Sequence, residues 1–185
     1  MLFAALIAAT ISAPSTVAVS RCNNYVTTSL EDKVRGFDRR PPSAKDRNDR
    51  YAALQGITAS ANEEADILHA VCSDDDYVPI AAQLSAVEAW TQLLEADLNQ
   101  ANYDDKCKAA AQPVARAFVA HAWLLLVKAD PEQTGRYPSI QNVLPKAKTR
   151  AAALGLTLPT PADTSAYWLT QQQQAADEAI KTCGQ

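Results

Sequence analysis

Apolar side chains recur along most of this chain with the spacing of an α-helix, and this periodicity limits the fold more than any other feature. The first long stripe places small or apolar residues at i, i+3, i+7, i+11, i+14 and i+18: Leu54, Ile57, Ala61, Ala65, Leu68 and Cys72. Such a pattern is one face of a single amphipathic helix. No stretch of strict alternation competes with it, and the chain holds only 5 glycines. The sequence therefore predicts an all-α protein.

Similar stripes predict the remaining helices, and helix breakers set their ends. We expect long helices over about 79–99, 104–127, 139–154 and 163–183, and a shorter one within 21–37. Gly155 is expected to stop the helix that precedes it, because glycine readily adopts the left-handed conformation found after many helices. The prediction is a single domain over 21–185, a disulfide-stapled bundle of about five helices, mostly up-and-down, in which 37–43 is an exposed linker.

The first twenty residues carry no charge. An apolar run of about ten residues is followed by small residues, which is the layout of a secretory signal peptide over 1–20. The run is well short of the roughly 20 residues of a membrane-spanning helix, so we do not expect the mature protein to span a membrane. The predicted location is secreted or periplasmic.

Four cysteines in an oxidising compartment predict two disulfides. Strict alternation of the helices would place Cys72 and Cys107 at opposite ends of the bundle, and would bring Cys183 back to the Cys72 end. This argument favours Cys72–Cys183 with Cys22–Cys107. The sequence leaves the other pairings open, among them a tie between the termini, Cys22–Cys183.

A basic segment stands out in a chain whose net charge is −4. Between Arg35 and Arg50 it carries six basic residues and three acidic ones, a local charge of +3. We expect either a solvated linker or an arm that docks a protein or an anionic surface. The residues that would bind are Arg35, Phe37, Arg39, Arg40, Arg47 and Arg50.

The tryptophans supply a second candidate site. Trp90 and Trp123 lie beside the main stripes of their helices, where they would seal helix contacts or line an apolar ligand pocket.

Signals for catalysis, metals and nucleic acid are weak. His121 lies on an apolar stripe without an evident triad partner, and we interpret it as a core residue. His69 and the run Asp74–Asp76 lack the spacing of a metal site, and helix capping explains the acidic run. We expect no metal and no cofactor, and the acidic balance disfavours nucleic acid as a partner.

Two short resemblances accompany these patterns. The leader, the helical body and the four cysteines, with Cys72 and Cys107 spaced like a second bridge, resemble plant invertase and pectin methylesterase inhibitors. That family's closely spaced amino-terminal cysteine pair is absent here. The run Asp97–Tyr103 is similar to a segment of periplasmic lysozyme-inhibitor-like proteins, although their Trp-to-Cys signature is missing. Neither resemblance transfers a functional residue.

The sequence therefore favours an exported helical binding or inhibitor-type protein that acts through a rigid surface, without catalysis. One alternative is a carrier that holds a small apolar ligand between helices near Trp90 and Trp123. A second alternative is a hydrolase that uses a histidine–carboxylate pair.

Overall fold

The computed structural model describes residues 28–37, 46–100, 105–129, 138–160 and 162–183. Within them lie six helices: α2 (Thr28–Gly36), α3 (Arg47–Val71), α4 (Asp74–Gln100), α5 (Asp105–Lys128), α7 (Pro138–Ala153) and α8 (Ser165–Cys183). The predicted all-α bundle is confirmed. The helix limits lie within a few residues of the predicted ones, except that α4 begins at Asp74, so the acidic run predicted to cap this helix forms its first turn. The leader predicted over 1–20 lies outside the described residues.

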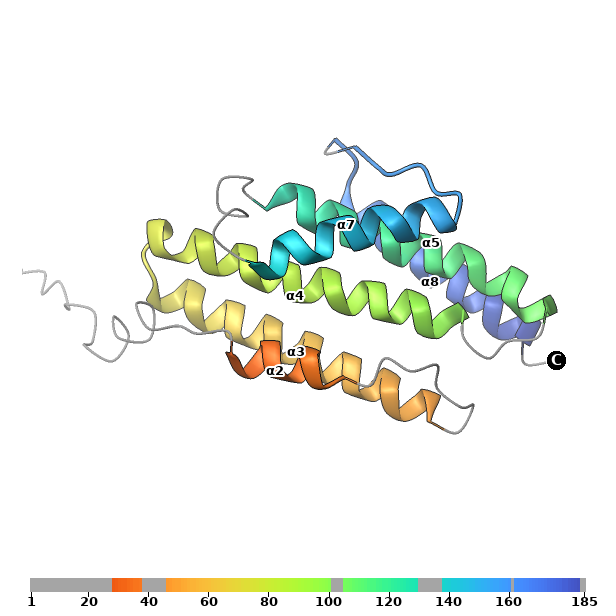
Figure 1. The fold of residues 1–185 in the computed structure, drawn as a ribbon, viewed down its shortest axis with the longest axis horizontal. Coiled ribbons are helices and arrows are strands. Elements are labelled where there is room, and N and C mark those ends of the chain that lie inside the picture. The colour runs from red at the N-terminus through yellow and green to blue at the C-terminus, as the bar shows by residue number, and fades with distance from the viewer. Residues whose placement is uncertain (1–27, 38–45, 101–104, 130–137, 161, 184–185) are drawn as a thin grey trace, which may run out of the picture.

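Helix α4 runs through the middle of the bundle. It contacts α5 most extensively and also packs against α3 and α7 (Figure 1). Alanines contribute much of its buried surface, including Ala86, Ala89 and Ala96. Small side chains let neighbouring helix axes approach closely, so α4 is enclosed on several sides.

Helix α5 has an apolar composition that fits its place in this core. The stretch Cys107–Lys128 is long and apolar enough to cross a membrane, and it is the one such stretch in the described part of the chain. Core helices share this composition. Here α5 packs against α4, α7 and α8, and Val119 and Leu124 are fully buried. The bundle therefore accounts for its apolar character.

Helix α7 ends where Gly155 was predicted to stop it. Gly155 has a φ of 59°, in the left-handed region that glycine adopts without steric cost. The Leu156 amide donates to the Ala151 carbonyl at 2.9 Å, and the Gly155 amide donates to the Ala152 carbonyl at 3.1 Å. This is the Schellman pattern, which satisfies the last carbonyls of the helix.

The segment after Gly155 runs back along the bundle. Three contacts follow α5 from its middle to its end: Arg116 Nε donates to the Leu154 carbonyl at 2.8 Å, Trp123 Nε1 to the Pro159 carbonyl at 3.0 Å, and Lys128 Nζ to Ser165 Oγ at 3.1 Å. Helix α8 therefore begins beside the end of α5 and runs in the same direction as α4 and α7 (Figure 1).

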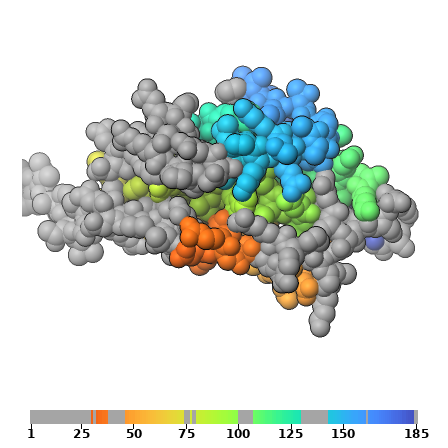
Figure 2. Space-filling model, in the orientation of Figure 1, coloured from red at the N-terminus to blue at the C-terminus, as the bar shows by residue number. Residues whose placement is uncertain are grey.

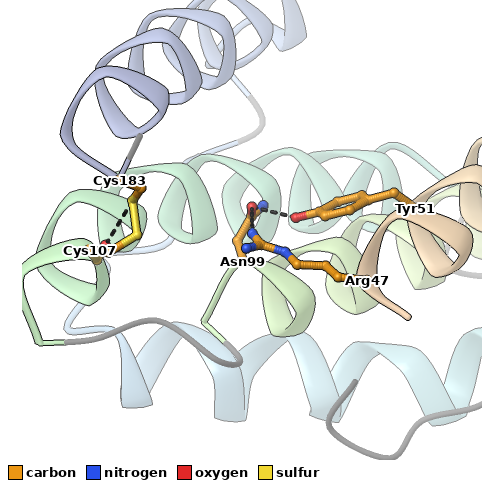
Figure 3. The surroundings of a disulfide bond; sticks show 5 residues. All are labelled: Arg47, Tyr51, Asn99, Cys107 and Cys183. Carbon is orange, nitrogen blue, oxygen red and sulfur yellow. Dashed lines mark hydrogen bonds between the residues drawn. A yellow bond between two sulfur atoms is a disulfide. The ribbon is translucent and has the colours of Figure 1, made fainter. Parts of the chain in front are cut away.

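The direction of α8 leads to a disulfide that differs from the predicted ones. Cys107 is bonded to Cys183, with 5.0 Å between their Cα atoms, so Cys72–Cys183 and Cys22–Cys107 are both wrong (Figure 3). The alternation on which they rested fails at one connection, because α7 and α8 are parallel rather than antiparallel. Cys72 is disulfide-bonded as well. Cys22 lies outside the described residues.

Helix α8 stands outside the main core. Ala179 is its one buried residue among those described, while Tyr167, Leu169 and Ile180 are exposed. Besides the disulfide, Gln172 Nε2 ties it to the bundle by donating to Gln92 Oε1 at 3.3 Å. The disulfide therefore fastens the end of α8 to the start of α5, the helix against which α8 packs.

We predict that replacing Cys107 and Cys183 together by serine lowers the free energy of unfolding by about 4 kcal/mol, because the bond closes a loop of 76 residues. Urea unfolding of the oxidised protein measures this change. A digest of the unreduced protein should release one linked peptide pair that contains Cys107 and Cys183. A pair that joins Cys72 to Cys183 would contradict the structure.

Candidate functional site

The described part of the molecule contains a groove of about 550 Å³ between α4 and α7. Figure 2 shows the face of the molecule on which α7 lies beside α4. The volume is within the roughly 300–1,000 Å³ typical of small-molecule sites. The lining residues come from both helices: Trp90, Leu93, Leu94, Asp97, Pro145, Lys146, Thr149 and Arg150.

The walls of the groove follow from the helical repeat. On α4, Trp90, Leu93, Leu94 and Asp97 lie at i, i+3, i+4 and i+7, which is one face of a helix. The α7 residues show the same repeat, at i, i+1, i+4 and i+5 from Pro145. Because Trp90 meets Lys146 and Asp97 meets Arg150, the two helices run parallel along the groove.

The groove combines an apolar floor with charged groups. Trp90 is 9% exposed, and the Lys146 ammonium lies 4.0 Å from the centre of its ring. One end is closed by an ion pair, in which Arg150 Nη2 donates to Asp97 Oδ2 at 2.8 Å. Burial raises the pKa of the Asp97 carboxyl, and the neighbouring Arg150 guanidinium opposes that rise. Such a mixture of aromatic surface and a few polar groups is typical of ligand sites.

Trp123 lies elsewhere, so the two tryptophans do not share a pocket. Its indole Nε1 donates to the Pro159 carbonyl, and Lys148 Nζ lies 5.6 Å from the ring centre. Trp123 thus seals the returning segment against α5, the packing role that was one of its two predicted roles. Trp90 alone lines the groove.

The basic segment is only partly described. Arg39, Arg40 and most of the linker predicted over 37–43 lie outside the described residues. Phe37 is half-buried and packs against the core. Arg35 is exposed and lies 3.9 Å from Asp32, while Arg50 is half-buried on α3.

Arg47 is directed into the bundle. Its Nη2 donates to Asn99 Oδ1 at 3.4 Å, and its guanidinium lies 5.5 Å from the centre of the Tyr51 ring. Tyr51 also donates a hydrogen bond to the same Asn99 oxygen, near the Cys107–Cys183 disulfide (Figure 3). Arg47 therefore stabilises the contact between α3 and α4.

Neither histidine belongs to a catalytic arrangement in the described part of the chain. His121 is 4% exposed, and burial lowers the pKa of its imidazole, with a smaller contribution from Lys128. His69 is exposed on α3, where its ring lies 4.9 Å from that of Tyr77. In the described part of the chain, neither histidine bonds to a carboxylate, and no group of three or more His, Cys, Asp and Glu side chains could hold a metal ion.

A polar stripe on α4 went unpredicted. Glu88, Gln92, Glu95 and Asn99 lie at i, i+4, i+7 and i+11 on this central helix. Burial raises the pKa of the Glu88 carboxyl, and raises that of Glu95 to about 7. Burial is also the main cause that raises the pKa of Tyr51, and the charge of Glu95 adds to that rise. The spacing of the two glutamates was the signal in the sequence.

Of the residues that line the groove, sequence reasoning selected Trp90 and missed the other seven, among them Asp97, Lys146 and Arg150. In the sequence, Lys146 and Arg150 look like ordinary solvated positions on an exposed helix flank. Only the parallel alignment of α7 with α4 places them beside Trp90 and Asp97, and no local pattern encodes that alignment.

Comparisons with known proteins give no further guide. No family model matches the chain, and neither a curated protein nor a solved structure matches it. The fold therefore defines a disulfide-stapled helical bundle, and any function has to be argued from the site.

We predict that the buried Glu95 carboxyl lowers the free energy of unfolding as the pH rises. Its carboxyl has a pKa of about 7 in the folded protein and an ordinary value of 4.5 when unfolded. The folded state therefore binds the proton more tightly, and stability falls as the pH rises from about 4.5 to about 7. Replacing Glu95 by glutamine should raise the free energy of unfolding by less than about 1 kcal/mol at pH 5 and by about 3 kcal/mol at pH 8.

Urea unfolding at the two pH values tests this, with Glu63→Gln, an exposed position on α3, as the control. An equal effect of Glu95→Gln at both pH values would contradict the assignment.

Proposed function

We propose that this is an exported binding protein that holds a small, largely apolar ligand in the groove between α4 and α7. The observation that carries the proposal is the groove itself, about 550 Å³ in volume, with Trp90, Leu93 and Leu94 along one wall. A groove of this volume, with an apolar wall and a few polar groups, has the usual form of a small-molecule site.

Export is part of the proposal and rests on two supports. The charge-free apolar stretch at the start of the chain has the layout of a signal peptide. Disulfides, among them Cys107–Cys183, persist in oxidising compartments such as the periplasm or the extracellular space.

The groove is preferred to the other predicted functions for structural reasons. The basic segment as a docking arm is weakened by the inward packing of Arg47 and by the half-buried position of Phe37. A hydrolase would need a histidine within hydrogen-bonding reach of a carboxylate. His121 and His69 have no such neighbour in the described part of the chain.

We predict that the neutral apolar dye Nile red binds the protein and that filling the groove abolishes this binding. Thr149 is an exposed residue of the groove wall, so Thr149→Trp adds bulk to the groove without disturbing the core. The dye affinity should fall at least tenfold, measured by the rise in Nile red fluorescence. Ala152→Trp is the matched control, since Ala152 is exposed on the same helix but does not line the groove. Equal binding by both variants would disprove the proposed site.

A further inference from the structure

We infer that α8 is a lid on the bundle that opens in mild acid, with His121 as the pH-sensitive group and the Cys107–Cys183 disulfide as the tether that keeps α8 attached. This movement is independent of the proposed ligand groove. Three features support it: the position of His121 under α8, the groups that surround its ring, and the small buried surface of α8 itself.

His121 lies on the side of α5 that faces α8. Two other residues of α5 mark this side: Cys107 is bonded to Cys183, and Lys128 Nζ donates to Ser165 Oγ at 3.1 Å. His121 is fourteen residues after the first and seven before the second, and residues seven apart lie on nearly the same side of a helix. Because the His121 side chain is only 4% exposed, we conclude that α8 covers it.

Trp168 is the α8 residue at the level of His121. The two helices are antiparallel, and the disulfide and the lysine–serine contact fix their register. Gln172 Nε2 donates to the Ala117 carbonyl at 3.4 Å, one helical turn before His121 on α5. Trp168 lies one turn before Gln172 on α8, so the two rings occupy the same layer between the helices.

This layer contains two buried nitrogen atoms without a hydrogen bond. His121 Nδ1 and Trp168 Nε1 are both buried, and neither bonds to any of the described residues. An indole nitrogen only donates, so Trp168 Nε1 cannot accept a hydrogen bond from an imidazolium. A protonated imidazole carries an N–H on both ring nitrogens, and here the N–H at Nδ1 would lack an acceptor. The closed bundle therefore keeps His121 neutral.

The charges nearest to His121 along α5 and α8 also oppose its protonation. Burial lowers the pKa of the imidazole, and the positive charge of Lys128 lowers it further. On α8 the residues of this layer, Trp168 and Gln172, are uncharged. The charged residues Asp177 and Glu178 are exposed, more than two turns farther along the helix.

The other two helices that pack against α5 offer no compensating charge either. On α4, Glu88 lies one turn before Gln92, which bonds to Gln172 of α8, and burial raises the pKa of the Glu88 carboxyl. Protonation of that carboxyl removes a buried charge and so stabilises the closed bundle, opposite to the effect at His121. On α7, Lys148 lies over Trp123, on the other side of α5.

Little of α8 has to leave the core when the lid opens. Ala179 is its one buried residue among those described, and Tyr167, Leu169 and Ile180 are already exposed. Elements with few buried apolar side chains open at a lower free energy than the core does. The disulfide holds the last turn of α8, so the first turns, around Trp168, separate from α5 first.

The direction of the pH effect follows from the two states of the lid. In the open state the imidazole is solvated and has its ordinary pKa of 6.5, whereas in the closed state its pKa is lower. The open state therefore binds the proton more tightly, and the closed state loses stability as the pH falls below about 6.5. Between pH 7.5 and pH 5.5 the ratio of open to closed lid rises by up to about tenfold.

Hydrogen–deuterium exchange of the disulfide-intact protein at pH 7.5 and pH 5.5 tests this movement, with each rate corrected for the intrinsic effect of pH on amide exchange. We expect the protection of the first half of α8 to fall severalfold, and by at most about tenfold, at the lower pH. The protection of α4 should stay unchanged or rise, because protonation of Glu88 and Glu95 relieves buried charge there.

Three histidine variants identify the pH-sensitive group. His121→Leu and His121→Gln remove the titrating ring, so the pH response of α8 should vanish in both. Each variant is compared with itself at the two pH values, so a uniform loss of stability cancels. His69→Gln is the matched control, since His69 is exposed on α3, and it should respond like the wild type.

The results that would overturn the inference are distinct from those that bear on the groove. Equal protection of α8 at both pH values would overturn it, as would a pH response that persists in both His121 variants. An equal loss of protection in α4 and α8 would show that the whole bundle unfolds, and would overturn it as well. None of these outcomes affects the binding of Nile red at pH 7.5.

Discussion

The packing of α4 against α5 is the contact on which the rest of the structure depends. Alanines on both helices, among them Ala89 on α4 and Ala115 and Ala122 on α5, are almost completely buried. Small side chains let α4 and α5 approach closely. Because α3 and α7 also pack against α4, this helix has neighbours on most sides. Polar residues of α4 consequently lie in partly desolvated positions, and this explains the raised pKa values of Glu88 and Glu95.

The groove is a consequence of how α7 meets this central pair. Val143, Ala147 and Ala151 of α7 are buried in the core, so α7 inserts small side chains there. Its flank, with Lys146 and Arg150, is left beside Trp90 and Asp97 of α4. Contacts at Lys146–Trp90 and Arg150–Asp97 bridge the helices without filling the space between them. A rigid core thus supports an open site, as binding sites built on helices require.

Helix limits were predictable from the sequence because they depend on local signals. The stripe from Leu54 to Cys72 and the stop at Gly155 both operate within a few residues. The disulfides were not predictable, because they depend on the direction of one connection. Leu156 and Leu158 pack against the core, and this packing turns the segment back along α5 and brings Cys183 to Cys107. In the same way, Trp90 could be selected as a candidate from its type and position. The place of Lys146 in the groove, by contrast, depends on the tertiary arrangement of α7 against α4.

A crystal structure of the protein grown with Nile red would test the central claim most directly. The account predicts the dye in the groove between α4 and α7, against Trp90, Leu93 and Leu94. Dye bound only at another place, such as the exposed face of α8 at Leu169 and Ile180, would contradict it. A groove filled by the side chains of α4 and α7 would contradict it equally.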